Sequence, residues 1–146
     1  MNKIVAIGLL AGWAFLQAGA AELEWQTDLA KAQAQAKKEN KLVMLDFTGS
    51  DWCGWCKKLD AEVFSKSDFS EYAKKNLVLV EVDFPRFKKL SADQQKANNA
   101  LQEKYKIEGY PTIIVLDGEG KQVGQTGYKP SPKLFIEDLE KMKKKA

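Results

Sequence analysis

The sequence contains no histidine, and only two of its 146 residues are cysteines. Without histidine, the chain cannot form the Cys–His or Ser–His pairs that activate a catalytic nucleophile, and it lacks the commonest metal ligand. Two cysteines alone cannot complete the four-ligand shell of a zinc site. The composition therefore excludes catalytic pairs of that type and argues against a metal centre.

The chain also lacks a strong charge excess and a long hydrophobic run. Its formal net charge of +3 is too weak to predict nucleic-acid binding. The apolar run over residues 4–16 is shorter than the ~20 residues that a membrane-spanning helix needs. Lys3 ahead of it and Ala18-Gly19-Ala20 behind it match the layout of a secretory signal peptide. We therefore expect residues 1–20 to be removed on export, leaving a periplasmic or secreted protein of formal net charge +2 because Lys3 is lost.

Residues 21–146 show no internal repeat or low-complexity linker, so we expect a single domain. The order of elements, strand–helix–strand followed by a hairpin at residues 117–120, predicts parallel pairing and then antiparallel pairing. The fold class expected is α/β: a mixed central sheet flanked by helices, with an extra N-terminal helix. Apolar periodicity places helices at residues 25–40, 53–64, 67–75, 91–105 and from 132 onward, and strands at 41–47, 77–82, 112–116 and 121–125. In the last helix, the residues expected to face the core are Leu134, Phe135, Leu139 and Met142.

The two cysteines lie in the segment Trp52-Cys53-Gly54-Trp55-Cys56-Lys57, between a predicted strand and a predicted helix. In that context Cys53 falls at the helix N-terminus, where unpaired backbone N–H groups and the helix dipole stabilise a thiolate. A thiolate is the species that attacks a disulfide. Cys56, one helical turn further on, can attack the same sulfur and release a bound substrate. The spacing therefore predicts a redox-active pair.

Other roles for the pair fit less well. A bond between residues 53 and 56 closes a loop too small to constrain much of the unfolded chain, so it makes a poor structural staple. The surroundings typical of a peroxide-reducing cysteine, a threonine or proline ahead of a lone cysteine with an arginine partner, are missing, and Arg86 is the sole arginine. A binding module whose disulfide stays closed is the alternative that we carry forward.

Three features resemble the thioredoxin superfamily. Leu45-Asp46-Phe47 ends a strand ahead of the cysteine motif, Gly109-Tyr110-Pro111-Thr112 opens a later strand, and Gly127 follows the predicted hairpin. The resemblance covers residues 25–145 and implies a thioredoxin fold for the domain at residues 21–146.

The resemblance implies catalytic roles for three residues. Cys53 would be the nucleophile and Cys56 the buried resolving thiol. Asp46 would be a buried acid that moves protons during exchange, and a carboxyl group within an apolar strand is expected to have a raised pKa. The turn between Asp46 and Cys53 is one residue longer than in thioredoxin itself.

The resemblance also implies a substrate groove. Pro111 would be a cis-proline, and Tyr110 would offer its backbone to an extended substrate strand. Trp55 is expected to lie exposed beside the sulfurs, where it forms an apolar collar with Tyr110. Gly54 would let a substrate approach closely. The full set of predicted substrate-binding residues is Trp52, Gly54, Trp55, Tyr110, Pro111, Thr112 and Gly127.

These features predict a thiol–disulfide oxidoreductase that exchanges disulfides with cysteine-containing exported proteins, acting as a reductase or an isomerase. A reductant outside the cytoplasm needs an electron donor, which we expect to be a membrane protein. No cofactor, metal or nucleic acid is implied. Because the chain has no further domain through which to dimerise, we expect a monomer. The alternative is a non-catalytic thioredoxin-fold module that binds peptides or a partner.

Overall fold

The computed structural model describes residues 22–146, so the predicted signal peptide at residues 1–20 lies outside the described residues. The strands are β1 (Trp25–Gln26), β2 (Leu42–Thr48), β3 (Leu77–Asp83), β4 (Thr112–Leu116) and β5 (Gln122–Thr126). The helices are α1 (Leu29–Glu39), α2 (Gly54–Leu59), the π-helical segment η1 (Asp60–Phe64), α3 (Ser67–Asn76), α4 (Ala92–Lys104) and α5 (Pro132–Lys143). Within residues 22–146, no helix has the length and apolar character needed to span a membrane.

The strands form one mixed sheet in the order β1-β3-β2-β4-β5. β1 and β2 both pair with β3 in parallel, whereas β4 pairs antiparallel with β2 and with β5. This arrangement confirms the predicted mixed sheet. The turn over residues 117–120 joins β4 to β5, and Gly120 adopts φ +85 there, a conformation that glycine tolerates best.

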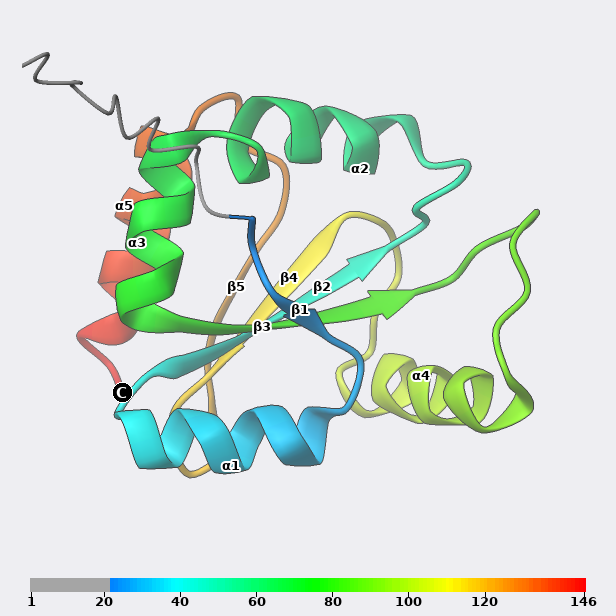
Figure 1. Cartoon of the computed structure of the whole chain (residues 1–146), viewed down its shortest axis with the longest axis horizontal. Helices are drawn as coiled ribbons and strands as arrows, with labels where there is room; N and C mark the ends of the chain where they lie inside the picture. Colours follow the sequence, from blue (N-terminus) through cyan, green and yellow to red (C-terminus); the bar gives the residue numbers. More distant parts are fainter. Residues whose placement is uncertain (1–21) are drawn as a thin grey trace, which may run out of the picture.

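Helices cover both faces of this sheet: α1 and α4 lie on one face, and α2, α3 and α5 lie on the other (Figure 1). Alternate residues of β2 supply the two cores, since successive side chains of a strand point to opposite faces. Met44 packs in the cluster that contains Phe69 and Phe135, and Leu45 packs in the cluster that contains Ala36. All seven residues of β2 are buried, as expected for a strand covered on both faces.

Three expectations for the helices do not hold as stated. The helix expected from residue 25 begins at Leu29, with Asp28 as its N-cap, because Trp25 and Gln26 instead form β1 and pair with β3. An extra N-terminal helix is not confirmed, because α1 follows β1 and connects it to β2. In α5, Phe135, Leu139 and Met142 are buried as predicted, but Leu134 is 44% exposed and does not face the core.

The site-bearing end of the sheet is set by the register of its two longest strands. Thr48, the last residue of β2, is the register partner of Asp83, the last residue of β3. Parallel strands that end level place the segments that follow them side by side. The cysteine-bearing segment therefore emerges beside the segment that leads from β3 to α4.

Candidate active site

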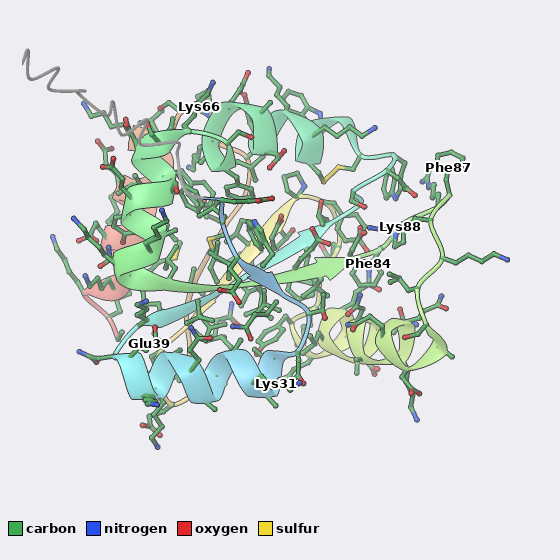
Figure 2. The ribbon with its side chains drawn as sticks, in the orientation of Figure 1. Lys31, Glu39, Lys66, Phe84, Phe87 and Lys88 are labelled. Carbon is green, nitrogen blue, oxygen red and sulfur yellow. A yellow bond between two sulfur atoms is a disulfide. The ribbon has the colours of Figure 1, made fainter. Side chains whose placement is uncertain are left out.

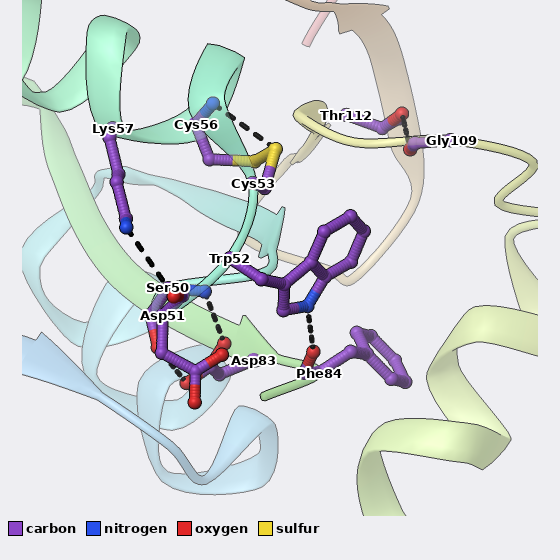
Figure 3. The surroundings of a disulfide bond; sticks show 10 residues. All are labelled: Ser50, Asp51, Trp52, Cys53, Cys56, Lys57, Asp83, Phe84, Gly109 and Thr112. Atoms are coloured by element: carbon purple, nitrogen blue, oxygen red, sulfur yellow. Dashed lines mark hydrogen bonds between the residues drawn. A yellow bond between two sulfur atoms is a disulfide. The ribbon is translucent and has the colours of Figure 1, made fainter. Parts of the chain in front are cut away.

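Cys53 is the N-cap of α2, and its Sγ accepts a hydrogen bond from the backbone N–H of Cys56 at 3.2 Å (Figure 3). The two cysteines form a disulfide with their Cα atoms 5.3 Å apart. Both residues are buried. In the reduced protein the same N–H group can stabilise a thiolate on Cys53, because hydrogen bonds to charged acceptors are stronger than those to neutral ones.

The turn between β2 and α2 is anchored to the end of β3. The Ser50 backbone N–H and hydroxyl both donate to the Asp83 carboxylate, at 2.9 and 2.5 Å. The Cys53 N–H donates to the Gly49 carbonyl at 2.8 Å. These bonds tie the position of Cys53 to the sheet. Sequence reasoning missed Asp83, although its place at the end of a predicted apolar strand is a usable signal.

Trp52 is held by contacts on several sides. Its indole Nε1 donates to the Phe84 carbonyl at 2.8 Å, and the ring is turned toward Phe84 (Figure 3). The ring also meets Tyr110 edge-on, with centroids 5.9 Å apart. A Cβ atom added to Gly49 would lie 2.5 Å from the Trp52 ring. Position 49 therefore needs glycine so that the indole can pack against the turn.

Gly49→Ala is expected to lower the free energy of unfolding by about 1–3 kcal/mol, because the new methyl group forces the Trp52 ring from its site. Urea denaturation measures the change. Gly109→Ala is the matched control: an added Cβ there meets nothing within 4 Å, so its stability should change by less than about 0.5 kcal/mol. Equal effects of the two substitutions would contradict the packing described for Trp52.

Trp55 is 57% exposed, which confirms its expected exposure. Its ring packs against Tyr128, with centroids 5.0 Å apart, and Lys58 Nζ lies 5.1 Å from the centre of the Trp55 ring. The Tyr128 hydroxyl donates a hydrogen bond to the Glu62 carboxylate. Trp55 therefore packs against Tyr128, and Tyr110 packs against Trp52, instead of the collar expected between Trp55 and Tyr110. Tyr128 was missed from the sequence, and its position directly after Gly127 is the signal that could have identified it.

The predicted groove residues around Pro111 come together in the structure. The Tyr110–Pro111 peptide bond is cis, as expected. The Thr112 hydroxyl donates to the Gly109 carbonyl at 2.6 Å. Gly127 lies beside this segment, since a Cβ atom there would be 3.4 Å from the Pro111 carbonyl oxygen. The Tyr110 hydroxyl accepts a bond from Gln102 on α4 at 2.6 Å.

Asp46 lies buried in the middle of β2, and its Oδ1 has no hydrogen-bond partner among the described residues. Burial raises the pKa of this carboxyl group to about 8, and the negative charge of Glu81, its register partner on β3, adds to the effect. A cavity of about 310 Å³ is lined by both Asp46 and Cys56. The longer turn therefore still leaves Asp46 and Cys56 on one cavity.

Within residues 22–146, no three histidine, cysteine, aspartate or glutamate side chains form a group that could hold a metal ion. What the site does offer is a reducible disulfide, a buried acid with a raised pKa, and one exposed aromatic side chain, Trp55, among half-buried ones. That arrangement suits transfer of electron pairs between disulfides.

The sequence model of the family described as a thioredoxin-like domain matches residues 29–143. The chain belongs to the thioredoxin-like family. A solved structure described as a DsbH oxidoreductase superposes on this thioredoxin-like chain with a TM-score of 0.79 at 33% identity, covering 90% of this chain and 94% of that one. The predicted superfamily and fold are thus confirmed.

Two of the relatives illustrate the similarity at the level of sequence. The disulfide bond reductase DsbH of Chlamydia pneumoniae is 39% identical over 111 residues, which cover 76% of this thioredoxin-like chain and 66% of that protein. The thiol:disulfide interchange protein DsbD of Pasteurella multocida is 31% identical over 115 residues, which cover 76% of this chain and 18% of that protein. The chain thus matches 66% of the first relative's length and a small part of the second's.

Proposed function

We propose that this protein is a thiol–disulfide oxidoreductase that exchanges disulfides with cysteine-containing exported proteins. The observation that carries the proposal is the Cys53–Cys56 disulfide at the start of α2, with the Cys56 N–H directed at Cys53 Sγ. The similarity to a disulfide bond reductase and to a thiol:disulfide interchange protein supports the same chemistry. It also favours the reductive direction over oxidation.

The reaction proceeds in two exchanges. The Cys53 thiolate attacks one sulfur of the substrate disulfide, so that a mixed disulfide forms and the other substrate sulfur leaves as a thiolate. Cys56, once deprotonated, attacks Cys53 Sγ, which breaks the mixed disulfide and releases the second substrate thiolate. Asp46 accepts the proton of Cys56 across the cavity that they share. The substrate gains two electrons, and the protein is left with the Cys53–Cys56 disulfide.

The surroundings of the sulfurs suit an extended polypeptide. Trp52 and Trp55 flank the cysteines, and Gly54 leaves room for a close approach. Substrate backbone lies along the segment Tyr110–Thr112, with Gly127 at its side. Regeneration needs an electron donor, for which we propose a membrane electron-transfer protein. We further propose that the protein works outside the cytoplasm, in the periplasm or after secretion, and that it is a monomer.

Catalysed reduction of insulin disulfides by a dithiol donor tests this function. The wild-type protein is expected to accelerate the reaction well above the rate with donor alone, and protein whose reduced cysteines have been alkylated should not. Equilibration with glutathione buffers gives the redox potential: a value near −270 mV indicates a reductase and one near −120 mV an oxidant. Peptide binding without turnover would favour the alternative, a non-catalytic binding module.

A further inference from the structure

A loop that the catalytic scheme does not use projects from the domain beside the cysteines. Residues 84–90, here called the β3–α4 arm, leave the end of β3 and extend away from the body of the molecule before α4 begins (Figure 1). Phe87 lies near the far end of the arm, as Figure 2 shows. Its side chain is 81% exposed, more than that of Trp55 or Leu134. An exposed aromatic ring offers a large apolar area to a binding partner.

The β3–α4 arm is fixed through the backbone of its middle residues. The Asp51 carboxylate accepts three hydrogen bonds from the backbone N–H groups of residues 86, 87 and 88, at 2.9, 2.8 and 2.8 Å. Lys88 Nζ pairs with the Asp83 carboxylate at 2.9 Å. Partial burial acts to raise the pKa of Asp51, but the three backbone hydrogen bonds outweigh burial and lower the pKa below its ordinary value. The carboxylate therefore stays charged. The exposure of Phe87 is therefore a property of a tethered loop.

The same bonds join the arm to the turn that precedes Cys53. Asp51 is two residues before Cys53, so their Cα atoms are at most about 7 Å apart. The Arg86 guanidinium lies 3.8 Å from the centre of the Trp52 ring. A polypeptide whose cysteine has reached Cys53 can therefore contact the arm with residues only a few positions away from that cysteine.

We propose that the β3–α4 arm is a second contact site for polypeptide substrates, at which Phe87 takes an apolar side chain and Arg86 takes a carboxylate of the segment that flanks the reacting cysteine. This proposal rests on the proposed function. Stacking on the indole fixes the guanidinium plane and leaves its N–H groups free to pair with carboxylates. Exposed Lys89 adds positive charge on the same loop, which complements an acidic segment, whereas Lys88 is already paired with Asp83. Asp51 is the positioning residue of the arm.

Substrate size tests the role of Phe87. For the full domain with Phe87→Ala, KM for insulin should rise about tenfold, the equivalent of one buried aromatic contact, whereas kcat should stay within about twofold. Turnover of a small aromatic disulfide, DTNB, should be unchanged because it has no flanking polypeptide segment to lie along the arm. Leu134→Ala removes another exposed apolar side chain, on α5, and should change neither the KM for insulin nor the turnover of DTNB. Phe87→Tyr should keep most of the wild-type KM.

The outcomes separate the two proposals. Failure of the wild-type protein to reduce either substrate contradicts the proposed function. Wild-type turnover of both, with an unchanged KM for insulin in Phe87→Ala, overturns the role of the arm alone. An equal loss of turnover of insulin and of DTNB in Phe87→Ala also overturns the role of the arm. Sedimentation showing a wild-type dimer that Phe87→Ala dissociates would make the arm a contact between two copies, which also overturns the proposal.

Positioning and charge are tested with two further variants. Asp51→Ala releases the backbone N–H groups of the arm and should raise KM for insulin to a similar extent, again with DTNB turnover preserved. Two disulfide-bridged peptides of equal length, one with glutamates and the other with lysines beside the cysteine, probe Arg86. The wild-type protein should prefer the acidic peptide, and Arg86→Gln should reduce that preference at least about threefold. Equal KM values for the two peptides in the wild-type protein would exclude the carboxylate contact.

Discussion

Cys53→Ser is expected to reduce the turnover of protein disulfides at least about 10³-fold, to the rate of the donor alone. A hydroxyl group at this position cannot form a disulfide. The sequence has only two cysteines, so Cys56 is the one thiol left in the variant, and it has no partner with which to form the internal disulfide. Cys56 also lies within α2 rather than at its N-cap. Insulin reduction with a dithiol donor measures the loss, and circular dichroism confirms that the variant is folded.

Cys56→Ser serves as the matched control, because it should stop the cycle one step later. Its Cys53 thiolate can still attack a substrate disulfide, and the backbone N–H of residue 56 that points at Cys53 Sγ remains in place. The variant should therefore accumulate a mixed disulfide with insulin, visible by non-reducing mass spectrometry, while Cys53→Ser forms none. Adducts in neither variant, with turnover retained in both, would exclude the assignment of Cys53 as nucleophile.

Patterns that are local in the sequence predicted much of this fold and site. The uninterrupted apolar run of β2 identified a strand buried on both faces. The spacing of Cys53 and Cys56 after that strand located the redox pair, whereas the cis bond at Tyr110-Pro111 was implied by the resemblance to the thioredoxin superfamily. The strand and the cysteine pair each depend on residues within a few positions of one another, so periodicity and motif spacing were sufficient to find them.

Features that depend on distant contacts were not predictable in this way. Trp25 fits a helical pattern, yet it forms a strand because β3, more than fifty residues later, offers a pairing edge. The contact of Trp55 with Tyr128 joins the start of α2 to the loop after β5. The bonds from the backbone of residues 86–88 to Asp51 depend on β2 and β3 ending level. In each case tertiary packing brings together residues that no sequence period relates.

Asp46→Asn is expected to stabilise the oxidised protein relative to the wild type as the pH rises from about 4 to about 8. The pKa of Asp46 is raised from 3.8 to about 8 in the folded chain because the carboxyl group is buried beside Glu81. Between these two pH values the folded state keeps a proton that the unfolded state has released, so wild-type stability falls as pH rises. Below pH 4 both states are protonated and this effect vanishes.

The asparagine variant has no such proton. The free energy of unfolding of the variant minus that of the wild type should therefore be on the order of 4 kcal/mol greater at pH 9 than at pH 4. Urea denaturation at the two pH values measures the difference. The fixed cost of an amide in the apolar strand cancels in this comparison. Val63→Ala, which removes buried apolar volume on η1 and no titratable group, should shift stability equally at both. Parallel pH profiles for wild type and Asp46→Asn would exclude a raised pKa.

The same substitution should slow catalysis even as it stabilises the fold. Asp46 and Cys56 line one cavity, and Oδ1 of Asp46 has no other hydrogen-bond partner among the described residues, so the carboxylate is available to take the proton of the resolving thiol. In the wild type, release of a preformed mixed disulfide should accelerate as pH rises toward about 8, where Asp46 ionises. Asp46→Asn should be slower by about 10² at pH 7. A stabilised variant with unchanged release rates would show that the buried acid has no part in the exchange, since a purely structural carboxylate affects stability alone.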